Sequence, residues 1–162
     1  MGLGATELRR RHALAYRRIL VPLVADVESE TAMALAAELA DDNGSRITAV
    51  VVVEVPAALP LEAHMLEEEA EAKRALEDAR AIGYARGVSV RTRTLRARLA
   101  GEAIVEEAER AHADLVVLRA PRSERRRKVF GRTVDYVLKH APCRVMVAAP
   151  PSSACAKPQH VS

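Results

Sequence analysis

The chain has 162 residues, a length that suits one domain built around one hydrophobic core. Hydrophobic residues make up 49% of it and aromatic residues only 2%, with no tryptophan, which argues against a nucleic-acid-binding face that stacks bases on rings. The formal net charge is only +3, so any function that depends on basic residues must come from a local cluster rather than from the chain as a whole.

The first third of the chain alternates between apolar runs and a helical pattern. Residues 1–16 are polar and basic, and we expect a flexible leader there. The continuous apolar run 18–24 is typical of a strand that is buried on both faces. Apolar residues then follow helical spacing between Asp26, a good N-cap residue, and a stop at Asn43–Gly44. The β-branched run 47–53 predicts a second buried strand.

A long helix and a charged strand are predicted next. The helix runs from about residue 61 to residue 85, with an acidic front half and a basic back half that suit the helix dipole. Its expected inward stripe consists of Leu66, Ala70, Lys73, Leu76, Ala79 and Ile82. Residues 88–95 alternate, so that Arg91 and Arg93 share one face. A strand with a solvated, charged face is typical of a protected sheet edge.

The last third repeats the alternation. The pattern predicts a helix over 102–113, a buried strand over 115–118, a helix over 132–140 and a final strand over 143–148. In the last helix, Val134, Val137 and Leu138 are expected to face inward. Residues 150–162 are rich in Pro, Ser and Ala, and we expect a disordered tail.

This strict alternation predicts an α/β fold: a three-layer, five-stranded parallel sheet with helices on both faces, in one domain over 17–149. Right-handed crossovers and the charged third strand favour the strand order 3-2-1-4-5. The fifth strand is then an edge, and its apolar character predicts a homodimer formed through it. The residues of this dimer edge are Arg144, Val145, Met146 and Val147.

Basic residues gather in the segment between the predicted fourth strand and the last helix. This segment carries seven basic residues and one acid, Glu124. Such a cluster indicates an anionic partner, and a solvated surface loop is an equally open interpretation. The basic residues are Arg119, Arg122, Arg125, Arg126, Arg127, Lys128 and Arg132.

Several segments resemble the universal stress protein family, in the family's order and spacing, from about Tyr16 to Ala149. The family's first strand is similar to YRRILVPL, the entry into its fourth strand to AHADLVVL, and its last helix and strand to GRTVDYVLKHAPCRVMV. The resemblance implies a Rossmann-like fold of the kind found in adenine nucleotide alpha hydrolases.

The nucleotide-binding branch of that family implies a phosphate site after the fourth strand. It has Gly-x-x-Gly there, and about nine residues later a Gly followed by Ser or Thr. In this chain the first motif falls on residues 119–122, where arginine replaces both glycines. Gly131 matches the third glycine, Arg132 takes the Ser/Thr place and Thr133 follows. The family's adenine-contacting acid falls at about Val24.

These departures imply a degenerate nucleotide site. Two arginine side chains take space that phosphates would use, and Pro121 has no amide donor. Cations beside a helix N-terminus would still attract an anion, so ATP or another adenine nucleotide stays open as a cofactor. The candidate residues for nucleotide or anion binding are Pro22, Val24, Val52, Arg119, Arg122, Gly131, Arg132 and Thr133.

Three functions are compatible with these features. The first is a non-catalytic regulatory or stress-response module with a degenerate nucleotide site. The second is a nucleotide-binding universal stress protein with at most slow ATPase activity, in which Gly131, Thr133 and the arginines hold the phosphates. The third is a transporter-associated cytosolic sensor of an anionic ligand or lipid, because the loop also resembles universal-stress domains appended to amino-acid permeases. In that setting the basic patch, Arg125–Lys128, and the arginines of the leader would face anionic lipid.

Catalytic and metal-binding motifs are absent from the sequence. There is no His-Glu-x-x-His, Gly-x-Ser-x-Gly or Cys-x-x-Cys pattern, and His64 beside Glu67 and Glu68 is interpreted as part of a solvated helix. We therefore expect no enzyme, no metal and, because the basic patch is short and lacks aromatic residues, no nucleic-acid partner. No apolar run approaches the ~20 residues of a membrane span, and no secretory signal opens the chain, which favours the cytoplasm or the inner membrane face.

Overall fold

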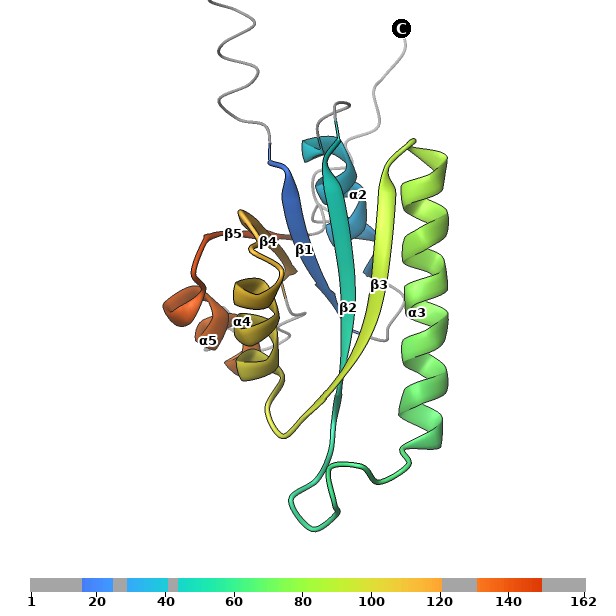
Figure 1. Ribbon diagram of the computed structural model, residues 1–162, viewed down its shortest axis with the longest axis vertical. Helices are drawn as coiled ribbons and strands as arrows, with labels where there is room; N and C mark the ends of the chain where they lie inside the picture. The colour runs from blue at the N-terminus through green and yellow to red at the C-terminus, as the bar shows by residue number, and fades with distance from the viewer. Residues whose placement is uncertain (1–15, 25–28, 41–43, 121–130, 150–162) are drawn as a thin grey trace, which may run out of the picture.

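A single parallel sheet organises the molecule. The computed structural model describes residues 16–24, 29–40, 44–120 and 131–149. Their strands pair in the order β3-β2-β1-β4-β5, which confirms the predicted α/β class and strand order (Figure 1). The strands are β1 (Arg18–Leu23), β2 (Arg46–Glu54), β3 (Ser89–Ala97), β4 (Leu115–Arg119) and β5 (Arg144–Ala148).

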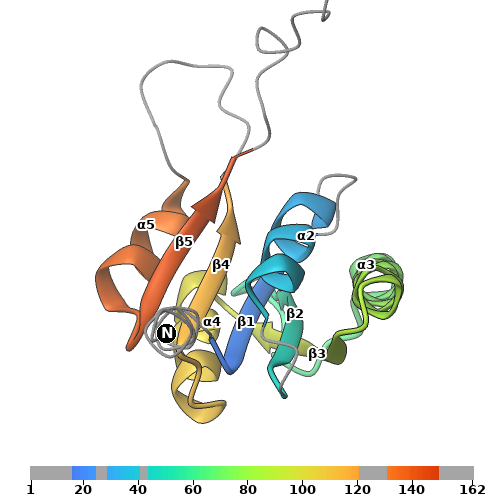
Figure 2. The ribbon, with the colours of Figure 1, turned by 90° about the horizontal axis from the view of Figure 1, so that it is seen from above.

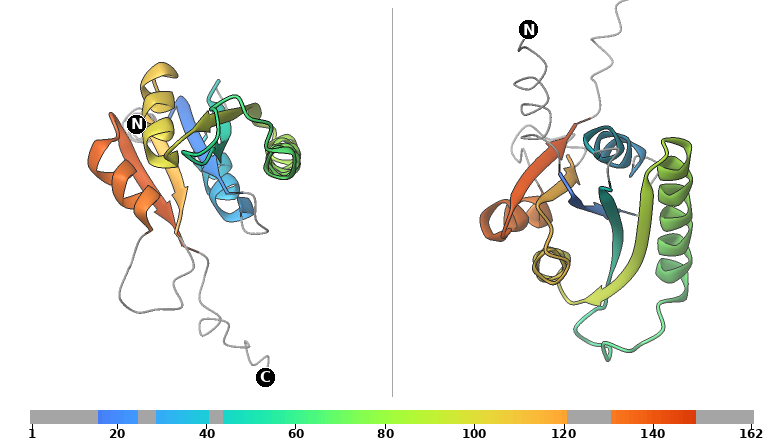
Figure 3. Two further views of the ribbon diagram at one scale, coloured as in Figure 1. Left: turned by 90° about the horizontal axis from the view of Figure 1, so that it is seen from below. Right: turned by 45° about the horizontal axis from the view of Figure 1, so that its top comes forward.

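Helices cover both faces of this sheet. Figure 2 and the view from below in Figure 3 show α2 and α3 on one face and α4 and α5 on the other. In the part of the chain that the structure describes, no helix is both long and apolar enough to cross a membrane. The helices are α2 (Ser29–Leu39), α3 (Leu66–Ala85), α4 (Ala100–Arg110) and α5 (Arg132–His140).

Two apolar clusters hold these layers together. Successive side chains of a strand point to opposite faces, so Ile19 and Val21 pack under α2 and α3 while Leu20 packs under α4 and α5. β1 lies in the middle of the sheet, and all its residues after Arg18 are buried. This explains why its sequence is continuously apolar rather than alternating.

The long helix α3 corrects two sequence-based expectations. It begins at Leu66 rather than near residue 61, because two turns closed by the carbonyls of Pro56 and Pro60 precede it. Leu66 was expected on the inward stripe, yet it is 73% exposed. Leu76 and Ala79 are buried as predicted. They form the buried stripe together with two further small residues, Ala72 and Gly83, which let the helix lie close to the sheet.

Other boundaries shift by a few residues. β3 extends to Ala97, and α4 runs two to three residues earlier than expected, ending at Arg110. On α5, Val134 and Val137 are buried as predicted, but Leu138 is 43% exposed. The cause is that Val134 and Val137 already fill the contact with the sheet and α4, which turns the next residue toward solvent.

The start of β1 is fixed by contacts from distant segments. Tyr16, placed in the expected leader, is only 8% exposed and pairs with Ala40 in an isolated bridge. The Asp114 carboxylate accepts hydrogen bonds from the backbone amides of Arg17 and Arg18, at 2.9 and 3.0 Å. The ordered domain therefore includes Tyr16.

Candidate functional site

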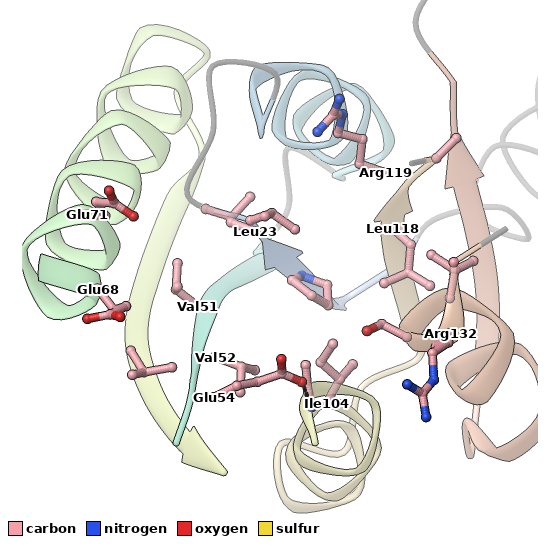
Figure 4. Close-up of a pocket in the computed structure, with 18 residues that line it drawn as sticks. Leu23, Val51, Val52, Glu54, Glu68, Glu71, Ile104, Leu118, Arg119 and Arg132 are labelled. Carbon is pink, nitrogen blue, oxygen red and sulfur yellow. Dashed lines mark hydrogen bonds between the residues drawn. The ribbon is translucent and has the colours of Figure 1, made fainter. Parts of the chain in front are cut away.

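A pocket of about 670 Å³ lies at the carboxyl edge of the sheet (Figure 4). It is bounded by the ends of β1, β2 and β4 and by the N-terminus of α5. This is the point where the strand order reverses, because β2 and β4 follow β1 on opposite sides. Open parallel sheets place their ligand sites at such a switch point.

Most sequence-predicted site residues meet in this pocket. Arg122 and the basic patch Arg125–Lys128 lie outside the described residues, so the interpretation as a transporter-associated sensor, which rests on them, stays a prediction. The predicted residues that line the pocket are Pro22, Val24, Val52, Arg119, Gly131, Arg132 and Thr133.

The floor of the pocket is apolar. Leu23 and Val51 come from the ends of the two central strands, and Ile104 and Leu118 come from α4 and β4. Figure 4 shows these side chains around the end of β1. Such a floor can accommodate a flat, uncharged ring, while polar groups at the rim decide its orientation. Val24, at the position of the family's adenine-contacting acid, is 66% exposed and supplies no side-chain acceptor.

One end of the pocket favours an anion. Gly131 is the N-cap residue of α5 and supplies no side chain, so the amides of the first turn have no side-chain cap. Arg132 and Thr133 form that first turn and line the pocket. The helix dipole and the guanidinium group therefore act in the same direction and attract negative charge.

The end of β4 differs from a glycine-rich phosphate loop. Arg119 is the last residue of β4, at the place of the first glycine. The amide of Ala120 donates to the carbonyl of Ala148 at 2.7 Å and so extends the pairing of β4 with β5. That amide is not available to a phosphate, and the next residue, Pro121, has none.

The other end of the pocket is acidic, which the sequence did not indicate. Glu54 ends β2, and Glu68 and Glu71 reach the pocket from α3. The Glu54 carboxylate accepts the amide of Ala100 at 2.7 Å and thereby caps α4. Figure 4 shows Glu68 and Glu71 across the pocket from Arg119 and Arg132. The only sequence signal for the α3 acids was their position in the first turns of a helix, which the helix dipole already explained.

The carboxylates of the pocket do not form a metal site among the described residues. Among the described residues, no group of three or more His, Cys, Asp or Glu side chains could hold a metal ion. The pocket thus combines three regions: an apolar floor, a basic end on β4 and α5, and an acidic end on β2 and α3.

The family of the chain follows from a comparison with known families. Residues 15–149 match the model of the universal stress protein family. The chain belongs to the universal stress protein family. The resemblance of the three sequence segments is thus confirmed, while the resemblance to transporter-appended members of the family stays a prediction. No curated protein matches the chain.

Solved universal stress proteins share this fold. UspA from Lactobacillus plantarum is 26% identical, with a TM-score of 0.67 over 83% of this chain and 98% of that one. The Archaeoglobus fulgidus universal stress protein in complex with dAMP is 21% identical, with a TM-score of 0.66 over 82% and 98%. A family member from Arabidopsis thaliana with AMP bound is 18% identical, with a TM-score of 0.64 over 85% and 94%.

Proposed function

We propose that this universal stress protein is a non-catalytic regulatory module whose pocket binds a nucleoside monophosphate. The observation that carries the proposal is the separation of charge in the pocket, with arginines at the β4–α5 end and carboxylates at the α3 end. An anion with one neutral, ring-bearing end fits this arrangement in one orientation only. Solved relatives in complex with dAMP or with AMP bound support this ligand class.

The phosphate would lie at the N-terminus of α5. The first-turn amides, the Arg132 guanidinium group and the Thr133 hydroxyl are the donors available there. The nucleoside would then lie over Leu23 and Val51, away from the phosphate and toward the acidic end. A second phosphate group placed at the acidic end would be repelled by Glu68 and Glu71.

A monophosphate is favoured over a triphosphate because of the end of β4. A chain of three phosphates needs several backbone donors, which a glycine-rich loop provides. Here the Ala120 amide pairs with Ala148, and the Arg119 side chain stands where the family's first glycine leaves space. The same feature supports a protein that senses a nucleotide without hydrolysing it.

Calorimetry with AMP and adenosine tests the proposal. We expect AMP to bind about tenfold more tightly than adenosine, because one charged phosphate contact contributes about 1.4 kcal/mol. Arg132→Gln should remove most of that difference while leaving adenosine binding unchanged. The matched control is Lys139→Gln, an exposed residue in the last turn of the same helix, which removes the same charge without touching the pocket.

Three results would contradict the proposal. One is magnesium–ATP binding that Arg132→Gln weakens and that is about tenfold tighter than AMP binding, which would require the triphosphate cradle that the end of β4 lacks. Another is steady release of inorganic phosphate from ATP by the purified protein, which would favour the slow-ATPase alternative. If neither AMP nor adenosine binds, the pocket does not serve a nucleoside.

A further inference from the structure

A second groove, of about 620 Å³, lies at the opposite, amino end of the sheet, between α4 and β3. We call it the α4–β3 groove. It is lined by six arginines and, among the described residues, by a single acid, Glu107. None of these residues lines the nucleotide pocket. The nucleotide pocket therefore does not explain why six arginines lie together in this groove.

The strand register brings the arginines together. On β1 and β2, Arg18 is the direct neighbour of Arg46, and on β2 and β3, Thr48 is the direct neighbour of Arg91. Arg93 follows Arg91 by two residues and so points to the same face of the sheet. Neighbouring strands lie about 4.8 Å apart, so these guanidinium groups rise from one small area.

Among the described residues, four of the six arginines have no acidic partner. One of the four, Arg80, donates to the Thr92 hydroxyl at 2.7 Å, which leaves Arg18, Arg46 and Arg91. Glu107 is only 4% exposed and pairs with Arg93 at 3.4 Å and with Arg110 from its own helix. No carboxylate of the described residues lies within ion-pair distance of Arg18, Arg46 or Arg91, and all three side chains are exposed. Placing three uncompensated like charges on adjacent strands is unfavourable unless a ligand neutralises them.

The chemistry of the lining selects the ligand. Every cation in the α4–β3 groove is arginine, whose planar fork binds phosphate oxygens in pairs, and the Thr48 hydroxyl adds a further donor. The lining holds no aromatic side chain on which a base could stack. Figure 1 shows α4 rising beside β2 on the near side of the sheet, so the basic face is bordered on that side rather than flat, which suits a compact anion better than a membrane surface.

We propose that the α4–β3 groove binds a compact polyphosphate, an anion of two or more linked phosphoryl groups. Three unpaired arginines match the three to five negative charges of such a ligand, whereas a single phosphate could engage only one or two of them. The ligand could be free polyphosphate or the phosphate tail of a nucleotide, because both present the same oxygens to the groove.

Calorimetry with inorganic tripolyphosphate tests the proposal at about 150 mM salt, where diffuse charge effects are screened within about 8 Å. We expect saturable one-to-one binding that weakens at least about tenfold in Arg46→Gln/Arg91→Gln. The matched control is Lys73→Gln/Arg74→Gln, two exposed residues of α3 that remove the same charge outside the groove. It should change the affinity by less than about twofold. An arm with ATP distinguishes the two sources: a nucleotide tail predicts ATP binding that the groove variant loses and that Arg132→Gln keeps.

Several results would overturn the proposal. Equal losses in both double variants would mean a response to net charge alone. Unchanged binding in the groove variant would place the tripolyphosphate elsewhere on the chain. A melting temperature close to that of the native chain shows that a variant is folded. If the double variant does not fold, the single variant Arg91→Gln replaces it, with an expected loss of tripolyphosphate affinity of about threefold. AMP binding to the pocket should be unchanged in the groove variants, so this proposal and the proposed function fail separately.

Discussion

At the scale of single residues, Glu107 is the most deeply buried charged side chain among the described residues. It lies on the inner face of α4 at the edge of the α4–β3 groove, with Arg93 on β3 and Arg110 on α4 as its partners. Burial raises the pKa of Glu107 above its usual value of 4.5, although the nearby Arg93 acts to lower it. Loss of hydration therefore outweighs the attraction of the guanidinium group.

This pKa shift predicts a pH-dependent contribution to stability. Because the folded pKa of Glu107 is raised, its contribution is fully present below the unfolded value of 4.5 and is lost as the pH rises through the folded pKa. We expect the free energy of unfolding of the native chain, relative to that of Glu107→Gln, to increase on acidification from neutral pH toward the unfolded value of 4.5. Urea denaturation of both proteins measures this difference. The exposed neighbour Glu106→Gln serves as the control, and a difference that stays constant or shrinks would contradict the prediction.

The sequence predicted the pocket residues that come from strands better than those that come from helices. Val52 and Pro22 reach the pocket because they stand at the ends of strands whose apolar runs are plain in the sequence. Glu68 and Glu71 reach it from α3, and their placement depends on which face of that helix meets the sheet. That face also includes Ala72 and Gly83, small residues that the apolar periodicity did not place on it.

At the scale of elements, Asp114 joins the start of β4 to the start of β1. Its carboxylate accepts two backbone amides from the segment that enters β1, so one side chain sets the relative position of two neighbouring strands. This gives a physical role to the aspartate of the segment AHADLVVL, which the sequence comparison could only identify as a resemblance. The beginning of α4 depends on a similar long-range contact, from Glu54, and for that reason could not be predicted from local pattern.

Replacing Asp114 should therefore destabilise the central strands. We expect Asp114→Ala to lower the free energy of unfolding by about 1–2 kcal/mol, because two amides lose a charged acceptor at a partly solvated site. Asp114→Asn keeps one acceptor oxygen and should cost about half as much. Chemical denaturation measures both values. An alanine variant as stable as the native chain would show that water replaces the carboxylate without cost.

At the scale of the whole molecule, the two edges of the sheet differ in character. β3 is packed against α3 and presents arginines and threonines, whereas β5 presents Val145, Met146 and Val147, all half-buried in the single chain. An unpaired apolar edge favours association with a second copy. The homodimer through β5 thus remains a prediction that the edge position of this strand supports.

Light scattering tests the dimer. We expect a mass of twice 17.6 kDa at tens of micromolar, and a melting temperature that rises with protein concentration because association stabilises the folded chain. The control is Val145→Lys, which places a charge on the edge and should give a monomer. A native chain that stays monomeric over this concentration range would rule out the dimer.

The burial of Tyr16 provides a spectroscopic probe of the fold. The sequence has three tyrosines and no tryptophan, so the intrinsic emission of the protein comes from phenol rings alone. Tyr84 is 88% exposed and its surroundings change little on unfolding, whereas Tyr16 leaves the core when β1 separates from its neighbours. The third tyrosine, Tyr136, is half-buried on α5 and stacks on His140. A tyrosine signal recorded during denaturation therefore reports on the opening of the sheet at its centre together with the release of α5, and Tyr136→Phe isolates the first of these.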